Sequence, residues 1–331
     1  MAIAADQPIR WGIIGTGGIA STFAGDLKLL PDAEVVAVGS RSQESADEFG
    51  DRFAIPKRHA SYAALAEDPD IDAVYVATPH PWHRDGGLLG INAGKAVLIE
   101  KPFTINAGEA RELIEAAQAR GTFLMEAMWT RFLPHVVRIR ELIAEGRLGD
   151  VRSVIADHGQ WFPKDPDFRL FAEVLGGGAL LDLGVYPISF ASMILGKPST
   201  ITAVSNPAFT GVDAQTTVVM QYEGGRQSVA FTTLETLSAN QAAINGTEAR
   251  IEVDGVFYAP TSFRLITRER EVEHFTIEHE GQGLRHQAAE VGRCLRAGLT
   301  ESPILTLAET LSIMETMDEV RRQIGLRYSW E

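Results

Sequence analysis

Three side chains in this 331-residue sequence have the types and spacing needed for proton transfer, and the first of them is Lys101. It stands in the stretch AVLIEKPF, where four apolar residues are followed at once by Glu100, Lys101 and Pro102. A charged side chain at such a place either lies at the protein surface or is held at the rim of a pocket, where it can act on a ligand. Pro102 fixes the backbone of the turn, which favours a lysine whose side chain is held in one orientation. A lysine exposed in a loop explains this stretch alone equally well.

The other two side chains are Asp182 and Tyr186, in the segment LGGGALLDLGVYPISF. They are four residues apart, so one helix face carries both. A carboxylate in an apolar helix is costly unless it has a partner, and Lys101 is a candidate partner for both groups. A tyrosine hydroxyl has a pKa near ~10, and a nearby ammonium lowers it by stabilising the phenolate. The alternative is a structural tyrosine beside a surface aspartate.

The elements that must position these groups begin with a repeated alternation in the first 125 residues. The apolar segments RWGIIG, AEVVAVGS, IDAVYVATP, AVLIE and TFLMEAM alternate with helical segments. Continuous apolar strands joined by helices indicate a parallel sheet covered on both faces. Ligands of such sheets bind outside the carboxyl ends of the strands. Lys101 is therefore expected at the mouth of a ligand crevice, and ATPHPWH, after the neighbouring strand, at the same rim.

A glycine-rich turn follows the first strand and opens the first helix. Gly15, Gly17 and Ala20 have the spacing G-x-G-x-x-A. In this strand–turn–helix context the pattern predicts a dinucleotide site, with the helix N-terminus receiving the pyrophosphate. A loop that serves only packing is the alternative. The predicted cofactor contacts in this turn are Gly15, Thr16, Gly17, Gly18, Ile19 and Ala20.

The second strand ends in VGSRS, where NAD sites usually have an acidic residue for the ribose hydroxyls. This chain has Ser40, Arg41 and Ser42 instead. Arg41 can pair with a 2′-phosphate, which a carboxylate would repel. The sequence therefore favours NADP over NAD, although a solvated arginine beside a serine N-cap is the plainer interpretation.

After about Trp129 the pattern changes to strands of alternating polarity joined by tight turns, such as EGGR. This pattern indicates an antiparallel sheet with one partly polar face, and two helices close the sequence. The expected fold class is α/β. It consists of an N-terminal Rossmann doubly wound parallel sheet in residues 1–126, which binds dinucleotide, and a C-terminal α+β domain in residues 127–331. The second domain has a large, mainly antiparallel open sheet and is expected to bind substrate and to dimerise.

The composition, 45% hydrophobic and 22% charged, is that of a globular protein. A net charge of −14 argues against a nucleic-acid partner. We see no signal peptide and no apolar run near the ~20 residues of a membrane span, so no membrane partner is expected. One cysteine, Cys294, and the absence of paired ligand spacings predict a cytoplasmic protein without a metal.

The segments GTGGIA, EKP and GGGALLDLGVY together resemble the glucose–fructose oxidoreductase / inositol dehydrogenase (Gfo/Idh/MocA) family over essentially the whole chain. Tyrosine at position 186, together with EAMWTRFLP, resembles the branch of dimeric dihydrodiol dehydrogenase and NADP-dependent xylose dehydrogenase. The resemblance implies that Lys101 and Tyr186 form the catalytic pair and that Asp182 contacts a substrate hydroxyl. Many members have asparagine where this chain has His80, whereas His83 keeps the family's next polar position.

The remaining expectations concern the pocket and the reaction. Cofactor contacts are also predicted from the strand ends, at Thr78, Pro79, His80, His83, Glu100 and Lys101. Substrate contacts are predicted at Trp129, Arg131, Phe162, Arg169, Asp182 and Tyr186. The expected protein is an NADP-dependent oxidoreductase of a sugar, cyclitol or trans-diol, and a homodimer or dimer of dimers. An aldose–ketose oxidoreductase with permanently bound NADP and a non-catalytic NADP-binding regulator are the alternatives.

Overall fold

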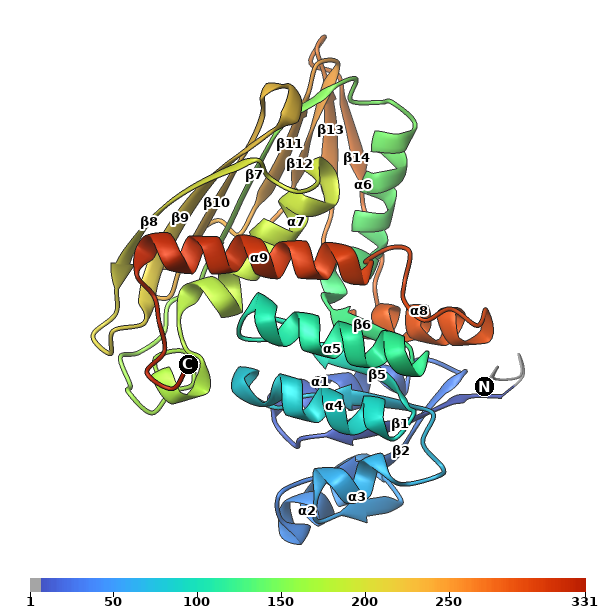
Figure 1. The fold of residues 1–331 in the computed structure, drawn as a ribbon. Helices are drawn as coiled ribbons and strands as arrows, with labels where there is room; N and C mark the ends of the chain where they lie inside the picture. The colour runs from blue at the N-terminus through green and yellow to red at the C-terminus, as the bar shows by residue number, and fades with distance from the viewer. Residues whose placement is uncertain (1–6) are drawn as a thin grey trace. The chain divides into compact units, whose positions relative to one another are not determined.

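The computed structural model describes residues 7–331, which form two compact units (Figure 1). The first unit runs to Trp129 and also contains Glu280–Leu311. The second contains Thr130–His279 and Ser312–Glu331. The sequence-based domains, 1–126 and 127–331, stay a prediction; they left Glu280–Leu311, which packs within the first unit, to the second domain.

The first unit contains a six-stranded parallel sheet with the strand order β3-β2-β1-β4-β5-β6. Its strands are β1 (Ile9–Ile14), β2 (Ala33–Gly39), β3 (Lys57–His59), β4 (Ala73–Val76), β5 (Ala96–Glu100) and β6 (Leu124–Ala127). The order reverses between β1 and β4, which is the switch point where such sheets bind ligands. Strands β4, β5 and β6 are buried along their whole length, as their continuous apolar sequences predict.

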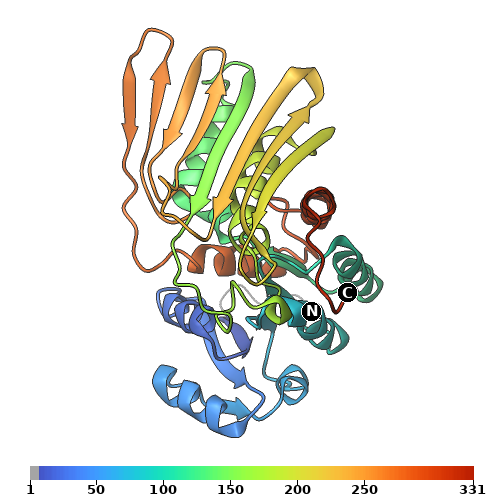
Figure 2. The same ribbon diagram turned by 90° about the vertical axis from the view of Figure 1, so that its left-hand side faces the viewer.

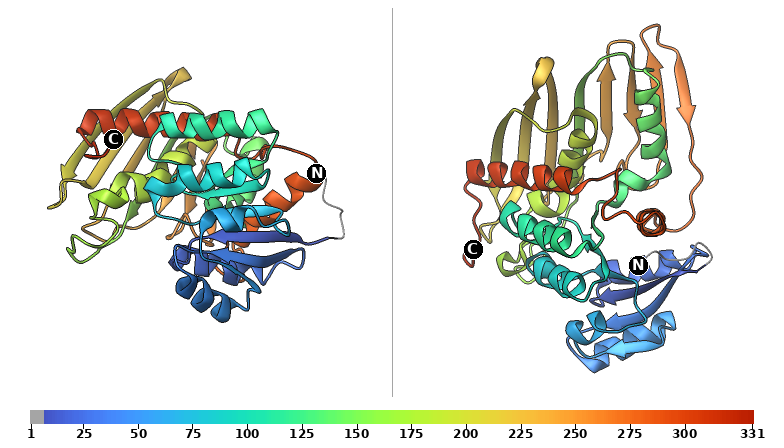
Figure 3. Two further views of the ribbon diagram at one scale, coloured as in Figure 1. Left: turned by 60° about the horizontal axis from the view of Figure 1, so that its bottom comes forward. Right: turned by 45° about the vertical axis from the view of Figure 1, so that its right-hand side comes forward.

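Helices cover both faces of this sheet (Figure 3). They are α1 (Gly18–Leu27), α2 (Gln43–Phe53), α3 (Tyr62–Ala66), α4 (His83–Asn92), α5 (Ala107–Arg120) and α8 (Arg285–Arg296), with the short 3₁₀ helix η1 (His80–Trp82). A second 3₁₀ helix, η2 (Trp129–Phe132), belongs to the second unit from Thr130 on. Helix α1 packs against α2 and α8, whereas α4 packs against α3 and α5. Ser42 and Ser61 cap α2 and α3, each accepting a backbone N–H, as the sequence predicts.

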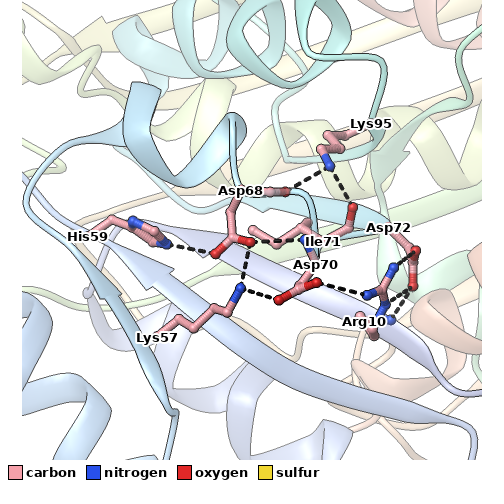
Figure 4. Close-up of polar contacts among 8 residues, drawn as sticks. All are labelled: Arg10, Lys57, His59, Asp68, Asp70, Ile71, Asp72 and Lys95. Carbon is pink, nitrogen blue, oxygen red and sulfur yellow. Dashed lines mark hydrogen bonds and ion pairs between the residues drawn. The ribbon is translucent and has the colours of Figure 1, made fainter.

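A network of charges ties together the N-terminal ends of these strands (Figure 4). Arg10, in β1, donates to both carboxylate oxygens of Asp72, at 3.0 and 2.8 Å. Lys57, at the start of β3, lies 2.7 Å from an oxygen of Asp68. Lys95, just before β5, donates to the carbonyl oxygens of Asp68 and Ile71, each at 2.8 Å. Ligands of a parallel sheet bind at the opposite ends of the strands, so this network serves the fold.

The second unit contains an eight-stranded sheet in the order β14-β13-β12-β11-β7-β10-β9-β8. All pairs are antiparallel except β7 with β10. The strands are β7 (Val151–Gly159), β8 (Thr200–Pro207), β9 (Asp213–Tyr222), β10 (Arg226–Thr233), β11 (Ala242–Gly246), β12 (Ala249–Val253), β13 (Phe263–Thr267) and β14 (Val272–Phe275). The 3₁₀ turn η5 (Glu223–Gly225) joins β9 to β10 where EGGR predicts a hairpin. The expected fold class is confirmed.

One face of this sheet is covered by helices, and no helix of residues 7–331 covers the other, bare face (Figure 2). The helical segments are α6 (Pro134–Ala144), η3 (Glu173–Leu175), η4 (Leu180–Gly184), α7 (Val185–Leu195) and α9 (Leu307–Ile324), whose first residues belong to the first unit. Helix α7 packs against β7 and β10.

The helical run Glu173–Leu195 corrects one expectation from the sequence. By length and composition it is apolar enough to cross a membrane, whereas the sequence analysis found no such segment. The most apolar stretch of this run is 83% buried inside the structure. Burial of this extent is typical of the core helix of a globular domain, because the surrounding protein already covers the apolar side chains.

Candidate active site

The glycine-rich turn after β1 has the geometry that a dinucleotide loop requires. Gly15 has φ +102°, a left-handed conformation, and a Cβ there would lie 2.9 Å from the Ala77 carbonyl oxygen. Gly17 precedes α1, and no side chain caps this helix. No atom lies within 4 Å of a Cβ built on Gly17 or Gly18. The turn is therefore tight on its inner side and open where the helix N–H groups face outward.

The residues around this turn fit a bound dinucleotide. Gly17, Gly18 and Ile19 are exposed, Thr16 is half-buried and Ala20 is buried. Thr78 follows β4, on the other side of the switch point, and its buried hydroxyl has no hydrogen-bond partner among residues 7–331. A buried hydroxyl without a partner costs free energy, and a ligand in the crevice can supply the missing bond. The predicted contacts of this turn thus have the space and the donors that a pyrophosphate needs.

The end of β2 carries Arg41, whose charge is not paired within the described part of the chain. Ser40 is buried, and its N–H donates to His59 O at 3.0 Å. Ser42 is used as the N-cap of α2, because its hydroxyl oxygen accepts the N–H of Ser45 at 3.2 Å. Arg41 is exposed and makes no hydrogen bond or ion pair with the described residues. Of these three residues, Arg41 has its charge available for a ligand.

The charged pair at the end of β5 is divided between a buried and a half-buried residue. Glu100 is 4% exposed, accepts the hydroxyl of Tyr75, and accepts the N–H of Lys101 at 3.1 Å. Lys101 is half-buried at the carboxyl end of the strand. Glu100 is thus part of the interior, where it holds the first residue of the turn. Of the two interpretations of AVLIEKPF, a charged residue at the protein surface is therefore excluded for Glu100.

The histidines of TPHPWH are both buried. His83 is 0% exposed, and its ring nitrogens lie 2.8 Å from the carbonyl oxygens of Pro102 and Thr78. Burial, with a contribution from His80, lowers the pKa of His83 to about 3. The bonds to the two carbonyls oppose this effect of burial, because a neutral ring has one N–H and can donate to only one of them. Both nitrogens face the carbonyls in either state, so neither is turned to a ligand and the ring connects the two loops. His80 lies at 5.6 Å from His83, ring to ring, and Pro79 is exposed.

In the second unit, Asp182 is paired with Arg169. The guanidinium donates two hydrogen bonds of 3.0 Å, one to each carboxylate oxygen. The side chain of Asp182 is 5% exposed and that of Arg169 is 51% exposed. The pair therefore presents a fixed carboxylate from a buried position, with its cation at the surface. The expectation that Asp182 needs a charged partner is answered within this unit by Arg169.

The helix that carries Asp182 differs from the expected α-helix. Residues Leu180–Gly184 form a π-helix, and α7 begins only at Val185. The assumption of one continuous α-helix through Asp182 is therefore wrong, whereas a shared helix face for Asp182 and Tyr186 stays a prediction. Single π-turns within helices occur frequently at functional sites.

Tyr186 is surrounded by aromatic residues that the sequence analysis missed. Its ring centroid lies 4.9 Å from that of Tyr258 and 5.2 Å from that of His158, and these two rings stack at 3.9 Å. Gln160 donates to the hydroxyl of Tyr258 at 3.1 Å. Tyr186 is 6% exposed. The one available signal was the pair of polar side chains, His158 and Gln160, at the end of the strand segment ADHGQ.

The remaining predicted substrate contacts have mixed surroundings. Arg131 is 2% exposed and donates to the hydroxyl and the carbonyl oxygen of Ser189, at 3.1 and 2.9 Å. These bonds hold η2 to α7 and give no support to a substrate contact. Phe162 is half-buried and packs on Phe168 at 5.3 Å. Trp129 is half-buried at the end of the first unit. Among residues 7–331 we find no group of three or more metal-ligating side chains.

Comparison with known proteins agrees with this geometry. Residues 9–128 match the oxidoreductase family model with an NAD-binding Rossmann fold (GFO_IDH_MocA), and residues 136–252 match the GFO/IDH/MocA C-terminal domain. Trans-1,2-dihydrobenzene-1,2-diol dehydrogenase of Sus scrofa is 40% identical, over 97% of this chain and 98% of the relative. The Homo sapiens enzyme of that name is 37% identical, with the same coverage.

Solved structures have the same fold. A 3-ketoreductase from Actinomadura kijaniata, in complex with NADP and TDP-benzene, is 29% identical with a TM-score of 0.85, over 96% of this chain and 98% of that chain. An aldose-aldose oxidoreductase from Caulobacter crescentus has a TM-score of 0.88 over the same shares, but is 23% identical and so supports the fold alone. The expected oxidoreductase with an NAD(P)-binding domain is confirmed: this chain belongs to the Gfo/Idh/MocA family of oxidoreductases.

Proposed function

We propose that the protein is an NADP-dependent oxidoreductase that moves a hydride between the nicotinamide and a C–OH or C=O carbon of a sugar, a cyclitol or a trans-diol. The observation that carries this proposal is the similarity to dihydrodiol dehydrogenases along nearly the whole chain. The bound cofactor would supply the redox chemistry, while the protein supplies position and proton transfer.

The preference for NADP rests on Arg41. This guanidinium stands directly after β2, where the adenosine ribose lies in folds of this kind, and it has no partner within the described chain. A planar guanidinium binds phosphate through two parallel hydrogen bonds. The residues on either side, Ser40 and Ser42, are hydroxyl residues, and no carboxylate at the end of this strand would repel a 2′-phosphate.

Tyr186 is proposed as the group that takes the proton of the substrate hydroxyl during oxidation. Lys101 would stabilise the phenolate form through its ammonium and donate a hydrogen bond to the same substrate oxygen. The alternative bases are the two histidines near the same strand ends, His80 and His83. Of these, His83 is fully buried with both ring nitrogens facing backbone carbonyls, which supports the tyrosine.

The substrate class follows from what surrounds Tyr186. The carboxylate of Asp182, fixed by Arg169, can accept a hydrogen bond from a second substrate hydroxyl. The half-buried ring of Tyr258, which stacks on the buried His158, offers an apolar surface beside Tyr186. Ligand sites commonly combine an apolar wall with a few placed polar groups. A ring with vicinal hydroxyls has both kinds of surface, so a cyclic diol, sugar or cyclitol is the proposed substrate.

The direct test is a change in NADPH fluorescence with a panel of aldoses, inositols, ketosugars and cyclic diols. Turnover with one of these classes is expected. Absence of turnover with every member would count against the proposal. NADP that remains bound through dialysis at one molecule per chain would favour the oxidoreductase with permanently bound cofactor. Cofactor binding without any turnover would favour the regulator.

We also propose that the protein is a homodimer that pairs through the bare face of the eight-stranded sheet. Val219, Val229, Ile155 and Ala243 stand side by side across four neighbouring strands. Ile155 is 50% exposed and Val219 is 39% exposed. A row of apolar side chains across an uncovered sheet is typical of an interaction surface.

A further inference from the structure

The loop before the π-helix is folded tightly onto the residues that follow Arg169. Gly178 has φ +123°, and its N–H donates to Leu170 O at 2.8 Å. A Cβ on Gly177 would lie within 2.8 to 3.0 Å of the carbonyl oxygens of Leu170, Ala172 and Arg169. Because these backbones are in contact, a shift at Gly177 must also move Arg169. The position of the Arg169–Asp182 pair therefore depends on what holds Gly177.

Gly177 is held by the segment that follows α9. Tyr328 is 1% exposed, and its hydroxyl donates to Gly177 O at 2.7 Å. Trp330 stacks on the Tyr328 ring at 5.4 Å and donates its indole N–H to Glu173 O at 3.3 Å. The N–H of Ser329 donates to the carboxylate of Glu173. Figure 1 shows this segment running from the end of α9 back to the region of η3 and η4.

The same segment is fastened to α9 by a buried cation. Arg321, 6% exposed, donates to the carboxylate of Glu331, and its guanidinium lies 4.8 Å from the ring centroid of Tyr328. Burial raises the pKa of Tyr328, and the nearby Asp213 adds to this rise. The hydroxyl of Tyr328 therefore keeps its proton and remains a hydrogen-bond donor at neutral pH.

A second buried group holds the far side of the loop. Asp213 is 3% exposed, and one of its carboxylate oxygens accepts the N–H of Leu180 and the hydroxyl of Thr216, each at 2.8 Å. Leu180 is the first residue of the π-helix. The other oxygen has no partner among the described residues and lies 2.2 Å from the place of a Cβ on Gly178. The start of the π-helix is thus fixed at two points, Gly177 by Tyr328 and Leu180 by Asp213.

We propose that Tyr328 is a positioning residue, which clamps Gly177 and thereby sets the place of the Arg169–Asp182 pair at the substrate site. The clamp consists of Tyr328–Glu331 with Arg321. Its hydrogen bonds to the loop are made at Glu173 and Gly177, neither of which is proposed to react. The proposal rests on the proposed function, because Asp182 and Arg169 bind substrate only if the protein is the oxidoreductase described above.

The test compares Tyr328→Phe with Tyr222→Phe. Tyr222 is an equally buried tyrosine of the same unit, 4% exposed, whose hydroxyl bonds to Ser228 at 2.9 Å, so it controls for the loss of a buried hydroxyl. Amide hydrogen exchange is measured first, without substrate. Exchange in residues 170–184 should become roughly three- to ten-fold faster in Tyr328→Phe, the effect of one lost hydrogen bond on local opening, and should be unchanged in Tyr222→Phe.

Kinetics with the substrate found in the panel form the second arm. Tyr328→Phe should raise KM by roughly three- to ten-fold more than Tyr222→Phe, with the Kd of NADP unchanged. Should Tyr328→Phe fail to fold, Glu173→Ala removes the acceptor of Ser329 at the edge of the clamp and should show the same changes, but smaller.

Each outcome decides a different claim. Exchange in residues 170–184 that is unaltered by Tyr328→Phe and Glu173→Ala overturns the clamp. Faster exchange with kinetic constants equal to those of Tyr222→Phe overturns the positioning role. If the wild-type protein turns over no substrate, the proposed function fails, and the exchange arm still shows whether Tyr328 holds the loop.

Discussion

Replacing Arg41 with alanine should separate the two nicotinamide cofactors. The guanidinium is exposed and has no partner among residues 7–331, so its removal leaves no described buried group unsatisfied and the fold should not change. The loss is then confined to the bond with the 2′-phosphate. A hydrogen bond to a charged group contributes about 1.5–3 kcal/mol, which corresponds to a roughly 10- to 150-fold increase in the Kd of NADP. The Kd of NAD should be almost unchanged.

Titration calorimetry with both cofactors is the assay, and Arg120→Ala is the matched control. Arg120 is exposed in the last turn of α5, which packs against α4, so the substitution removes the same charge from the same unit at a distance in the fold from the end of β2. Because the Arg41 contact is solvent-exposed, added salt should narrow the difference between wild type and Arg41→Ala. The reasoning is refuted if wild type binds NAD more tightly than NADP, or if Arg120→Ala weakens NADP binding as much as Arg41→Ala.

The remaining predictions concern the substrate pair, acid stability and assembly. Arg169→Ala should raise the KM for substrate about ten-fold. This is the low end of the increase expected for losing a hydrogen bond to a charged group, because half of the Arg169 side chain is exposed. An unchanged KM would show that Arg169 is not part of the site. Burial alone would raise the pKa of Asp68, but its contacts with Lys57, the N–H of Asp70 and His59 lower that pKa from 3.8 to about 2. The ionised carboxylate therefore stabilises the folded state above pH about 4, and this stabilisation is lost as the pH falls towards 2. The difference in melting temperature between wild type and Asp68→Asn should therefore shrink over this interval, and a constant difference would contradict the assignment. Light scattering at micromolar concentration should give a dimer for wild type and for Val272→Asp, and a monomer for Ile155→Asp. Val272 is the control because both residues are 50% exposed, but only Ile155 lies in the apolar row. A monomeric wild type would contradict the proposed dimer.

The parallel sheet could be predicted from the sequence because its strands are short and apolar throughout, so hydrophobicity alone marks β4, β5 and β6. The glycine-rich turn was equally accessible, since its spacing and its place between a strand and a helix are local properties. The same holds for Ser42 and Ser61, whose capping depends on bonds to residues three positions away.

Other elements depended on contacts that local patterns do not contain. Strand β14 is largely exposed and, among the described strands, pairs with β13 alone, so its sequence, VEHF, has no buried face to mark it. The π-helix over Leu180–Gly184 was read as α-helix because its extra residue leaves no signal in composition. Tyr258 and Tyr328 reach Tyr186 and Gly177 from 72 and 151 positions away, and spacing along a single sequence carries no trace of such contacts.

The central claim is that Tyr186 accepts the substrate proton, and steady-state kinetics of Tyr186→Phe test it most directly. With the substrate identified in the panel, kcat for oxidation should fall by ~10²–10⁴, the range for loss of a general base, while the Kd of NADP stays nearly the same. Lys101→Met should cost at least as much, and the double variant should lose no more than the worse single variant, because the two residues would act as one unit. The account is contradicted if Tyr186→Phe keeps most of its activity while His83→Ala, with cofactor still bound, has none.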